Sequence, residues 1–243
     1  MADEIFGHPR LAAIYDALDP DRSDLEPYLA LAAGLGARRV LDLGCGTGVF
    51  ALLLAARGHQ VVAADPARAS LDVARGKPGA ERVRWICGDA TAVPPLGADL
   101  VTMTANVAQS IAAPGAWSAT LAGARAALRP GGHLVFETRD PRRRAWEEWT
   151  PAASRTVTRI AGIGAVESRV EVTEMALPLV TIRWTYAFAA DGSTLTSDST
   201  LRFRDREEVA ADLAAHGLAL DEVRDAPDRP GRELVFLARR PER

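Results

Sequence analysis

The sequence has little cysteine, a single lysine and no long hydrophobic run. Its two cysteines, Cys45 and Cys87, lie in apolar surroundings and form no CxxC pair, so we expect neither a disulfide framework nor a bound metal. No apolar run reaches the ~18 residues of a membrane-spanning helix. The acidic start "MADEIFGHPR" also lacks the apolar segment of a secretory signal. These features predict a cytoplasmic protein with no membrane contact.

The charge balance is slightly acidic. The 243 residues carry a formal net charge of −3, with 25% charged and 48% hydrophobic residues. A chain of this size can bury a core without cross-links, as one domain with room for an insertion. Because no strong positive field would attract phosphate backbones, nucleic acid is not an expected partner. The sequence leaves monomer and homodimer open.

Strand-like and helix-like segments alternate through the first 139 residues. The strand-like segments are largely apolar: "RRVLDLG", "HQVVAADP", "RVRWICGDA", "ADLVTMTAN" and "HLVFETR". Strands of a parallel sheet that is covered on both faces show this pattern, so we predict an α/β fold with helices on both faces. One early helix is expected to begin with Ser23 as its N-cap, because Glu26 follows three residues later.

Residues 140–203 show a different pattern. Three segments, "RVEVTEM", "LVTIRWTYAF" and "STLTSDSTLRF", resemble strands, and Asp191-Gly192 is typical of a hairpin turn. The helix pattern returns at Asp205, which is placed to cap a helix, and two more strands follow. We therefore predict one α/β domain formed by residues 1–139 and 204–243, with an antiparallel β insertion at 140–203.

The stretch "VLDLGCGTGVF" places three glycines, Gly44, Gly46 and Gly48, between a strand and a helix. A strand, a glycine loop and a helix together form a common nucleotide site. A P-loop needs a lysine that is absent here, and the third glycine comes one residue too early for the dinucleotide motif GxGxxG. Asp42 would repel a pyrophosphate and attract a cation. The loop therefore favours a ligand without phosphates and with some positive charge.

"VLDLGCGTG" resembles the first motif of the class I S-adenosylmethionine-dependent methyltransferases, in particular of those that act on small molecules. Further matches follow in order: Asp65 lies 17 residues after Gly48, Asp89 ends the third strand, and "ALRPGGHLVF" resembles a late motif. The last two strands resemble the family's terminal hairpin. The resemblance implies a Rossmann-like, doubly wound, seven-stranded, mostly parallel sheet with an antiparallel last strand. The insertion after strand five lies where such enzymes vary.

The resemblance implies S-adenosyl-L-methionine as cofactor, with S-adenosyl-L-homocysteine as product. In the family an acid at the place of Asp65 accepts from the ribose hydroxyls, and one at the place of Asp89 lies near the adenine amino group. Each of these acids, and Asp42, has a simpler alternative as a turn or helix cap. The implied cofactor-binding residues are Asp42, Gly44, Cys45, Gly46, Thr47, Gly48, Asp65, Pro66, Asp89, Ala90, Thr104 and Asn106.

Candidates for catalysis lie at strand ends and in the amino-terminal segment. Methyl transfer needs an in-line nucleophile, exclusion of water and, for a hydroxyl acceptor, a base. We name His8, Tyr15 and Asn106; the alternatives are a surface histidine, helix packing and a turn residue. Asn106 is not followed by the prolines of the Asn-Pro-Pro-Tyr motif of amino-adenine methyltransferases, which disfavours a nucleobase acceptor.

Substrate contacts are expected after strands four and five and in the insertion. Arg139 is placed to receive an acidic group, and aromatic side chains of the insertion could form an apolar pocket wall. The alternative for these aromatic residues is a sheet face that packs on the domain or on a second subunit. The candidates are Gln109, Arg139, Trp146 and Trp184.

The sequence thus predicts an enzyme that transfers a methyl group from S-adenosyl-L-methionine to a nitrogen or oxygen of a small molecule. Three alternatives stay open: an RNA or protein methyltransferase, a protein that binds the cofactor without catalysis, and an NAD-dependent dehydrogenase, which the glycine spacing disfavours.

Overall fold

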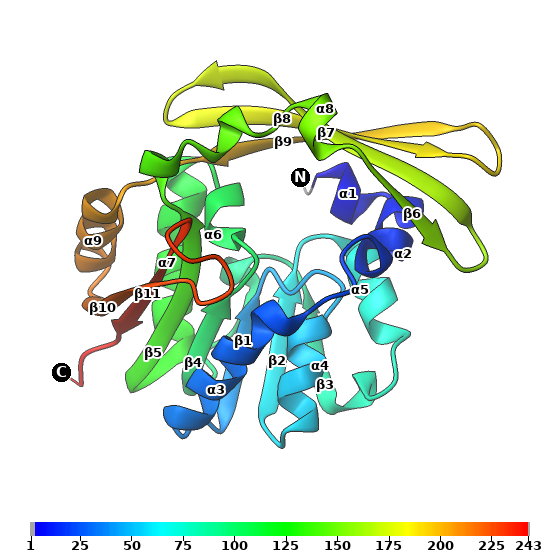
Figure 1. Ribbon diagram of the computed structural model, residues 1–243. Coiled ribbons are helices and arrows are strands. Elements are labelled where there is room, and N and C mark those ends of the chain that lie inside the picture. Colours follow the sequence, from blue (N-terminus) through cyan, green and yellow to red (C-terminus); the bar gives the residue numbers. More distant parts are fainter. Residues whose placement is uncertain (1–2, 243) are drawn as a thin grey trace.

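The computed structural model describes residues 3–242, which form two sheets with helices around and between them (Figure 1). No helix in this part of the chain is long and apolar enough to cross a membrane. The larger sheet has seven strands in the order β10-β11-β5-β4-β1-β2-β3. Their bounds are β1 Arg39–Leu43, β2 Gln60–Asp65, β3 Val83–Cys87, β4 Ala98–Met103, β5 Leu128–Arg139, β10 Ala219–Asp225 and β11 Glu233–Arg239.

The direction of these strands confirms the predicted fold class. Strands β1 to β5 pair in parallel, whereas β11 runs antiparallel to both β5 and β10. Consecutive residues of a strand point to opposite faces. On β1, Val40 packs with helices α3 (Glu26–Gly34) and α4 (Val49–Ala56). Leu41 packs with α7 (Pro114–Ala127) and α9 (Arg206–Ala215) on the other face.

The main hydrophobic core lies between the large sheet and the helices on its two faces. Leu54 of α4 and Leu121 of α7 are fully buried on opposite faces of the sheet. Truncating a buried leucine of this kind to alanine typically costs about 2–5 kcal/mol of stability. Helix α5 (Arg68–Arg75) follows β2 and contacts the amino-terminal helix α2 (Pro9–Leu18). This core makes the carboxyl ends of β1, β2, β4 and β5 a rigid platform.

Short helices complete the α/β domain. Helix α3 is preceded by a 3-10 turn, η1, so the prediction that Ser23 caps this helix is wrong: Ser23 lies inside that turn and makes no side-chain cap. Asp205, in contrast, accepts from the Glu208 N–H at 2.7 Å, as predicted. The remaining short elements are α1 Glu4–Gly7, η1 Ser23–Leu25, η2 Ala80–Arg82, η3 Ala90–Ala92, α6 Val107–Ser110, η4 Pro141–Arg143, η5 Ala145–Glu147 and α8 Pro151–Ser154.

The second sheet is antiparallel, with strands β6 (Thr156–Ile160), β7 (Gly164–Ala176), β8 (Leu179–Phe188) and β9 (Thr194–Arg202) in that order. The predicted Asp191-Gly192 turn joins β8 to β9, with Gly192 at φ +71°. Strand β6 was not predicted. It is an edge strand with no fully buried residue, so it lacks the apolar alternation that identifies a strand.

This second sheet extends over the carboxyl edge of the large sheet, and helices α1 and α2 lie between the two sheets (Figure 1). The Ile5 N–H donates to Ser197 Oγ of β9 at 2.9 Å, and Ser70 Oγ of α5 donates to the Phe6 carbonyl at 2.9 Å. The guanidinium of Arg10 lies 3.6 Å from the centre of the Phe188 ring. The amino-terminal segment therefore connects both sheets.

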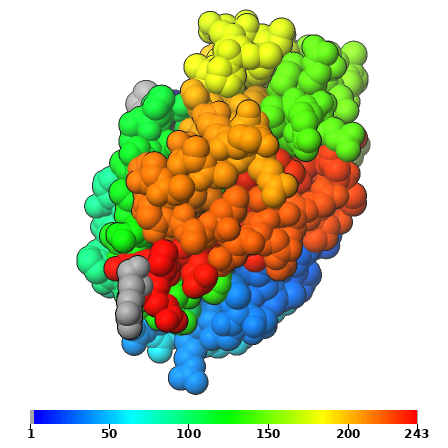
Figure 2. Space-filling model, turned by 90° about the vertical axis from the view of Figure 1, so that its left-hand side faces the viewer, coloured from blue at the N-terminus to red at the C-terminus, as the bar shows by residue number. Residues whose placement is uncertain are grey.

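A buried arginine anchors the far end of the second sheet. Arg204 is 1% exposed, and its guanidinium donates to the carbonyls of Ala108 and Ile111 at 3.0 and 2.7 Å. It also lies 4.5 Å from the Trp117 ring centre. Burial lowers its pKa to about 10, so it stays charged at neutral pH. Figure 2 shows α9 and β10, in orange, below the second sheet on this side of the molecule.

Candidate active site

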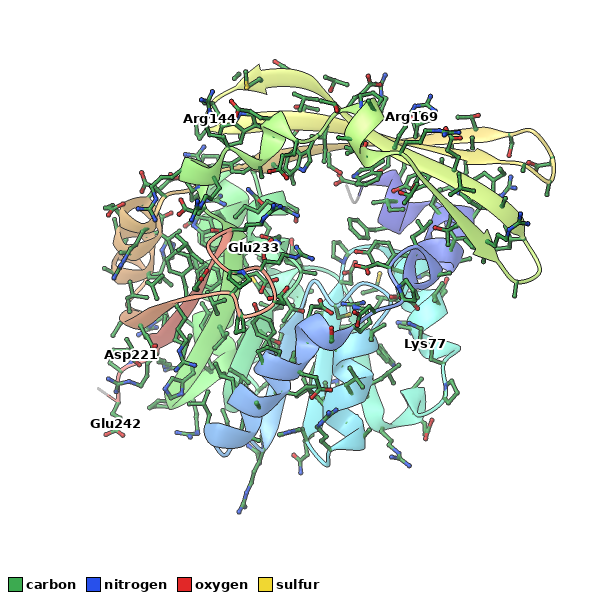
Figure 3. The ribbon with its side chains drawn as sticks, in the orientation of Figure 1. Lys77, Arg144, Arg169, Asp221, Glu233 and Glu242 are labelled. Atoms are coloured by element: carbon green, nitrogen blue, oxygen red, sulfur yellow. The ribbon has the colours of Figure 1, made fainter. Side chains whose placement is uncertain are left out.

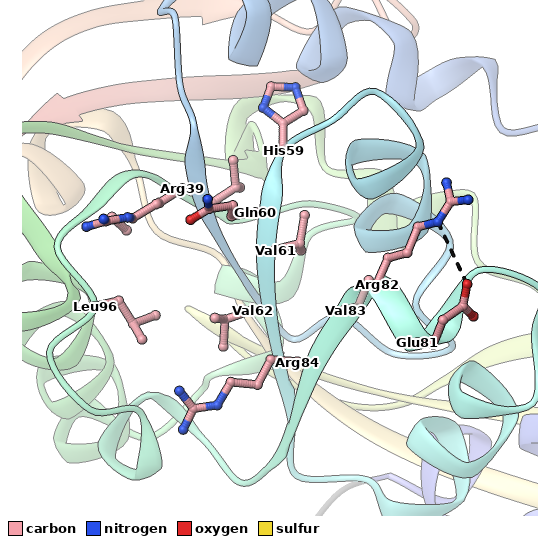
Figure 4. A pocket seen from close by; sticks show the side chains of 12 residues that line it. Arg39, His59, Gln60, Val61, Val62, Glu81, Arg82, Val83, Arg84 and Leu96 are labelled. Atoms are coloured by element: carbon pink, nitrogen blue, oxygen red, sulfur yellow. Dashed lines mark ion pairs between the residues drawn. The ribbon is translucent and has the colours of Figure 1, made fainter.

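Two cavities lie at opposite edges of the large sheet. One, of about 510 Å³, is lined by the beginnings of β1, β2 and β3, including Arg39, Gln60 and Arg84 (Figure 4). It contains none of the predicted site residues. The other, of about 480 Å³, is lined by Arg139, Trp149 and Glu233 at the carboxyl edge. Ligands of open α/β sheets bind beyond the carboxyl ends of the strands, so we place the site at that edge.

The glycine loop is shaped by close packing and by left-handed backbone. Gly44, Gly46 and Gly48 have φ values of +72°, +53° and +78°, a region that favours glycine. A Cβ on Gly44 would lie 2.5 Å from Val107, and one on Gly48 would lie 2.5 Å from Trp85. A Cβ on Gly46 would meet no atom within 4 Å, so the backbone there borders open space that a ligand can approach.

Asp42 lies below this loop and is 1% exposed. One of its oxygens accepts from Thr102 Oγ1 at 3.0 Å, and the other has no hydrogen-bond partner among residues 3–242. Burial, followed by repulsion from Asp65, raises the pKa of Asp42 to about 7. A nearby cation would lower that pKa and satisfy the unpaired oxygen, whereas a second anion would not.

Asp65 ends β2 and is fixed by two backbone groups. Its two oxygens accept from the N–H groups of Gly46 and Ala67, each at 2.7 Å. Burial raises its pKa, and these two hydrogen bonds oppose that rise. Each carboxylate oxygen can accept a further hydrogen bond. The carboxylate is thus held rigidly at the loop with acceptor capacity left for a ligand.

The amino-terminal helix α2 is joined to the glycine loop through Asp16, Thr47 and Lys77. Thr47 Oγ1 donates to Asp16 at 2.5 Å, and the Lys77 ammonium pairs with the same carboxylate. Lys77 also donates to the Thr47 carbonyl at 2.7 Å. Figure 3 shows Lys77 beside the end of α5. Since this ammonium already has these partners, it is not a free phosphate ligand.

The remaining predicted cofactor residues line the same edge. Cys45 is half-buried, and burial raises the pKa of its thiol. Asp89 is exposed and accepts from Thr91 N–H at 2.9 Å, so it caps the turn η3 that contains the buried Ala90. Pro66 is exposed after β2, and Thr104 is buried after β4.

The chain after β4 turns through two left-handed residues that are not glycine. Ala105 and Asn106 have φ values of +57° and +60°, a strained arrangement that is concentrated at functional sites. The Asn106 N–H donates to Glu137 at 3.2 Å, and its side-chain amide donates to Glu233 at 3.0 Å. The carbonyl oxygen of this amide has no partner among the described residues. The two glutamates therefore hold the turn.

Glu137 and Glu233 are buried next to each other at the ends of β5 and β11. They are 5% and 3% exposed. Burial, followed by repulsion from Glu233, raises the pKa of Glu137 to about 8. Figure 3 shows Glu233 at the top of the large sheet, near the middle of the molecule. A buried carboxylate with a pKa near neutral is typical of a group that exchanges a proton during catalysis.

Arg139 connects this cluster to Gln109. Its guanidinium donates to Gln109 Oε1 at 2.8 Å and lies 3.9 Å from Glu233. Gln109 is fully buried, and its side-chain nitrogen has no partner within residues 3–242. Desolvation lowers the pKa of Arg139. Asn106, Gln109 and Arg139, three of the predicted residues, thus form one polar cluster with Glu137 and Glu233.

His8 and Tyr15 occupy different surroundings. The His8 Nδ1 accepts from the Arg10 N–H at 3.1 Å and caps α2, so in the neutral ring the proton is on Nε2. This leaves no free lone pair on the ring, and we do not place the proton acceptor there. Tyr15 packs against Phe6, with ring centres 5.4 Å apart, in the apolar cluster below the second sheet. Burial raises its pKa.

The two tryptophans also differ from each other. Trp146 is 6% exposed and packs edge-on against Phe203 at 4.6 Å, as part of the core below β7 and β8. Trp184 is half-buried, stacks on Tyr186 at 6.1 Å and contacts both apolar clusters of the second sheet. Trp184 is therefore better placed than Trp146 to meet a ligand.

Several residues of the candidate site were given no role from the sequence. Glu137 could have been identified from the sequence, because it lies near the carboxyl end of an apolar strand, as Asp42 and Asp65 do. No local signal identifies the others, because their partners are distant in sequence. They are Asp16, Lys77, Thr102, Arg204 and Glu233.

The comparisons agree with this geometry. Residues 40–132, from β1 into β5, match the family described as a methyltransferase domain. The malonyl-[acyl-carrier protein] O-methyltransferase of Serratia marcescens is 35% identical over 135 residues, which are 53% of this chain and 49% of that protein. The chain thus spans about half the length of this curated relative.

Two solved structures are similar over nearly the whole chain. One is the amino pentose methyltransferase CalS10 from Micromonospora echinaspora, solved with S-adenosylmethionine bound. It is 25% identical, with a TM-score of 0.71, and the alignment covers 94% of this chain and 95% of that one. The other is the CcbJ methyltransferase from Streptomyces caelestis, 21% identical with a TM-score of 0.75, covering 95% and 96%.

Proposed function

Because this chain belongs to the class I S-adenosylmethionine-dependent methyltransferases, we propose that it transfers a methyl group to a nitrogen or oxygen of a small molecule. The observation that carries the proposal is the covered carboxyl edge, where buried acids and an open glycine loop lie below the chain's own second sheet. A covered edge suits an acceptor small enough to enter it. The net charge of −3 also gives no general attraction for RNA.

S-adenosyl-L-methionine is the cofactor, and the residues present fit it. Gly46 borders open space, Asp65 keeps acceptor capacity for hydroxyl groups, and Asp42 has an unpaired buried oxygen. This set of acceptors suits a phosphate-free nucleoside with positive charge. When bound, the cofactor supplies a methyl group on a positively charged sulfur and leaves as neutral S-adenosyl-L-homocysteine.

We assign Asp65 to the ribose hydroxyls and the loop Gly44–Gly48 to the backbone contacts of the nucleoside. Asp89 and Ala90 lie at the neighbouring strand end, where the adenine would be held. Asp42 acts from below the loop by its charge. Because positive charge on sulfur fades in the transition state, a carboxylate there contributes to binding more than to rate.

Nitrogen is the favoured acceptor atom. Glu233 and Glu137 are buried acids that can receive an ammonium group, and such a cation would lower the pKa of Glu137 from about 8. Once ionised in this way, Glu137 can take the proton that makes the nitrogen nucleophilic. The unpaired carbonyl oxygen of Asn106 can orient the resulting amine. The likeness to an amino pentose methyltransferase across 94% of the chain supports the same choice.

We propose that residues 140–203 act as a substrate cover. Trp184 and Tyr15 belong to one apolar cluster between the two sheets, and Arg204 fixes the far end of the cover to α6. Such a cover excludes water from the transfer step.

The test begins with thermal shift in the presence of S-adenosyl-L-methionine, S-adenosyl-L-homocysteine or NAD. Stabilisation by the first two, and not by NAD, is expected because a bound ligand raises the melting temperature. Labelled-methyl transfer is then screened over small-molecule and macromolecular fractions. Label in RNA or protein alone would move the function to the macromolecular alternative, and binding with no transfer to any fraction would favour a non-catalytic role.

A further inference from the structure

The cavity at the carboxyl edge has an unusual concentration of arginine. Its lining includes the guanidinium groups of Arg139, Arg143, Arg229 and Arg232, against two carboxylates, Glu148 and Glu233. Four positive and two negative charges leave a net charge of +2 in this lining, although the whole chain carries −3. Figure 2 shows the segment after β5 and the connection between β10 and β11 close together on one side of the molecule.

Arg143 is available to a ligand. It makes no ion pair with any residue of 3–242, unlike the other three arginines. Its guanidinium lies against Gly231. A Cβ added to this glycine would be 2.7 Å from Nη2 of Arg143. Gly231 has a φ of +71°, and its N–H donates to both oxygens of Asp225 at 2.7 and 2.8 Å. The loop thus brings a free guanidinium to the cavity.

The other arginines form the inner and outer walls. Arg139 is held by Gln109, and its guanidinium lies 5.4 Å from the Trp149 ring centre. Arg229 donates to Glu233 at 2.9 Å. Arg232 pairs with Glu148 at 3.2 Å, and both side chains are 66% exposed, so this pair contributes little and can exchange for a ligand.

The cavity shares its inner wall with the reaction region. Glu233 accepts from Asn106 in the turn after β4, and Arg139 donates to Gln109 in the following helix α6, so two lining residues contact the segment after β4. The side-chain nitrogen of the fully buried Gln109 is a donor without a partner among residues 3–242. A molecule could therefore occupy this cavity and reach the methyl-transfer position.

We propose that this cavity is an anion subsite of the methyl acceptor and binds a phosphate or carboxylate group of that molecule. The proposal rests on the methyl-transfer function and narrows it to acidic acceptors. Arg143 and Arg232 contact the anion at the mouth, Arg139 contacts it at the inner wall, and Trp149 offers a flat face beside it. Guanidinium groups bind both kinds of oxyanion through paired N–H donors.

Isothermal titration of the full chain with inorganic pyrophosphate and with succinate tests the subsite and separates phosphate from carboxylate. At least one probe is expected to bind with an affinity that falls with added salt. Arg143→Gln should weaken this binding roughly tenfold, as expected for loss of a charged hydrogen-bond donor. Gly231→Ala, which displaces Arg143 without removing charge, should weaken it too.

Arg84→Gln is the matched control, because Arg84 lines the cavity at the other edge of the sheet. Equal anion binding by the Arg143→Gln and Arg84→Gln variants would overturn the proposal. So would a protein that binds S-adenosyl-L-homocysteine but binds neither pyrophosphate nor succinate. Failure of wild-type protein to bind that nucleoside would instead overturn the proposed function, whatever the anions do.

Discussion

At the scale of single residues, Asp65 has one observed role and one proposed role, and a single substitution tests both. It closes the glycine loop through the Gly46 N–H and is assigned to the ribose. Asp65→Ala removes both, so we expect the affinity for S-adenosyl-L-homocysteine to fall at least tenfold, the equivalent of ~1.4 kcal/mol. Calorimetry measures it. Asp221→Ala, which removes a carboxylate from a surface ion pair with Arg239, is the control. An unchanged affinity in the Asp65 variant would rule out the ribose assignment.

Glu137 makes stability depend on pH in a direction opposite to that of most carboxylates. Its folded pKa of about 8 lies above the ordinary value of 4.5, so the folded state binds the proton more tightly. This contribution is fully present below the ordinary pKa and is lost as the pH rises through 8. Asp42, with a folded pKa of about 7, acts in the same direction.

We therefore expect the free energy of unfolding to fall, by on the order of 5 kcal/mol, between about pH 5.5 and about pH 8.5, with the larger share from Glu137. Glu137→Gln should reduce this fall, because glutamine does not titrate. Urea unfolding at the two pH values measures it. Glu222→Gln, which removes an exposed carboxylate on β10, serves as the control. If the free energy of unfolding fell by the same amount in both variants, the raised pKa of Glu137 would be contradicted.

Residues of the candidate site could be predicted when they lie at the carboxyl end of a strand, because that position alone places them at the ligand-binding edge of the sheet. Asp42 and Asp65 lie at the carboxyl ends of the apolar strands β1 and β2, and the carboxyl ends of parallel strands meet at one edge. Lys77 and Glu233 carry no such signal. Lys77 reaches the site only because α2 brings Asp16 to the loop, and Glu233 only because β11 pairs with β5.

At the scale of elements, helix α2 is attached to the glycine loop through Asp16, which contacts both Thr47 and Lys77. Lys77→Met removes the ammonium that bridges Asp16 and the Thr47 carbonyl, so α2 should detach more often. We expect cleavage within residues 1–22 to become several-fold faster in limited proteolysis, and the affinity for S-adenosyl-L-homocysteine to fall. Arg75→Met, at the exposed end of α5, should change neither. Equal cleavage rates in both variants would count against the attachment.

Elements with a strand or helix pattern in their own residues were predictable, and the edge strand β6, which lacks one, was not. The strands of the large sheet and Asp205 at the start of α9 agree with their sequence patterns. Strand β6 pairs only with β7 at an edge, so nothing in its own residues requires a strand. The start of α3 shifted from Ser23 because a 3-10 turn comes first and Pro27 occupies the first turn of the helix.

At the scale of the whole molecule, the second sheet should affect the acceptor and not the cofactor. Trp184→Leu removes an aromatic surface between the two apolar clusters of this sheet. We expect KM for the acceptor to rise several-fold, while the affinity for S-adenosyl-L-homocysteine stays within twofold. Steady-state kinetics and calorimetry separate the two effects. Met175→Leu, at an exposed position of β7, is the control. A parallel loss of nucleoside binding would place Trp184 in the cofactor site instead.

The seven strands of the large sheet and the antiparallel direction of the last one were predictable, because the resemblance covers those strands in sequence. The position of the second sheet was not, since it depends on contacts such as those of Ile5 with Ser197 and of Arg204 with Ala108. Such contacts join segments about 100 to 190 residues apart, and no local pattern records them.

The single lysine gives the molecule a built-in chemical reporter. Amine-reactive reagents attack only an uncharged, uncovered amine, and apart from the α-amino group the chain offers them Lys77 alone. While Asp16 and the Thr47 carbonyl hold that ammonium, acylation is slow. The labelling rate of one peptide in a mass spectrum therefore measures how often α2 is released, without any introduced probe. A ligand that draws α2 down onto the loop should slow that labelling.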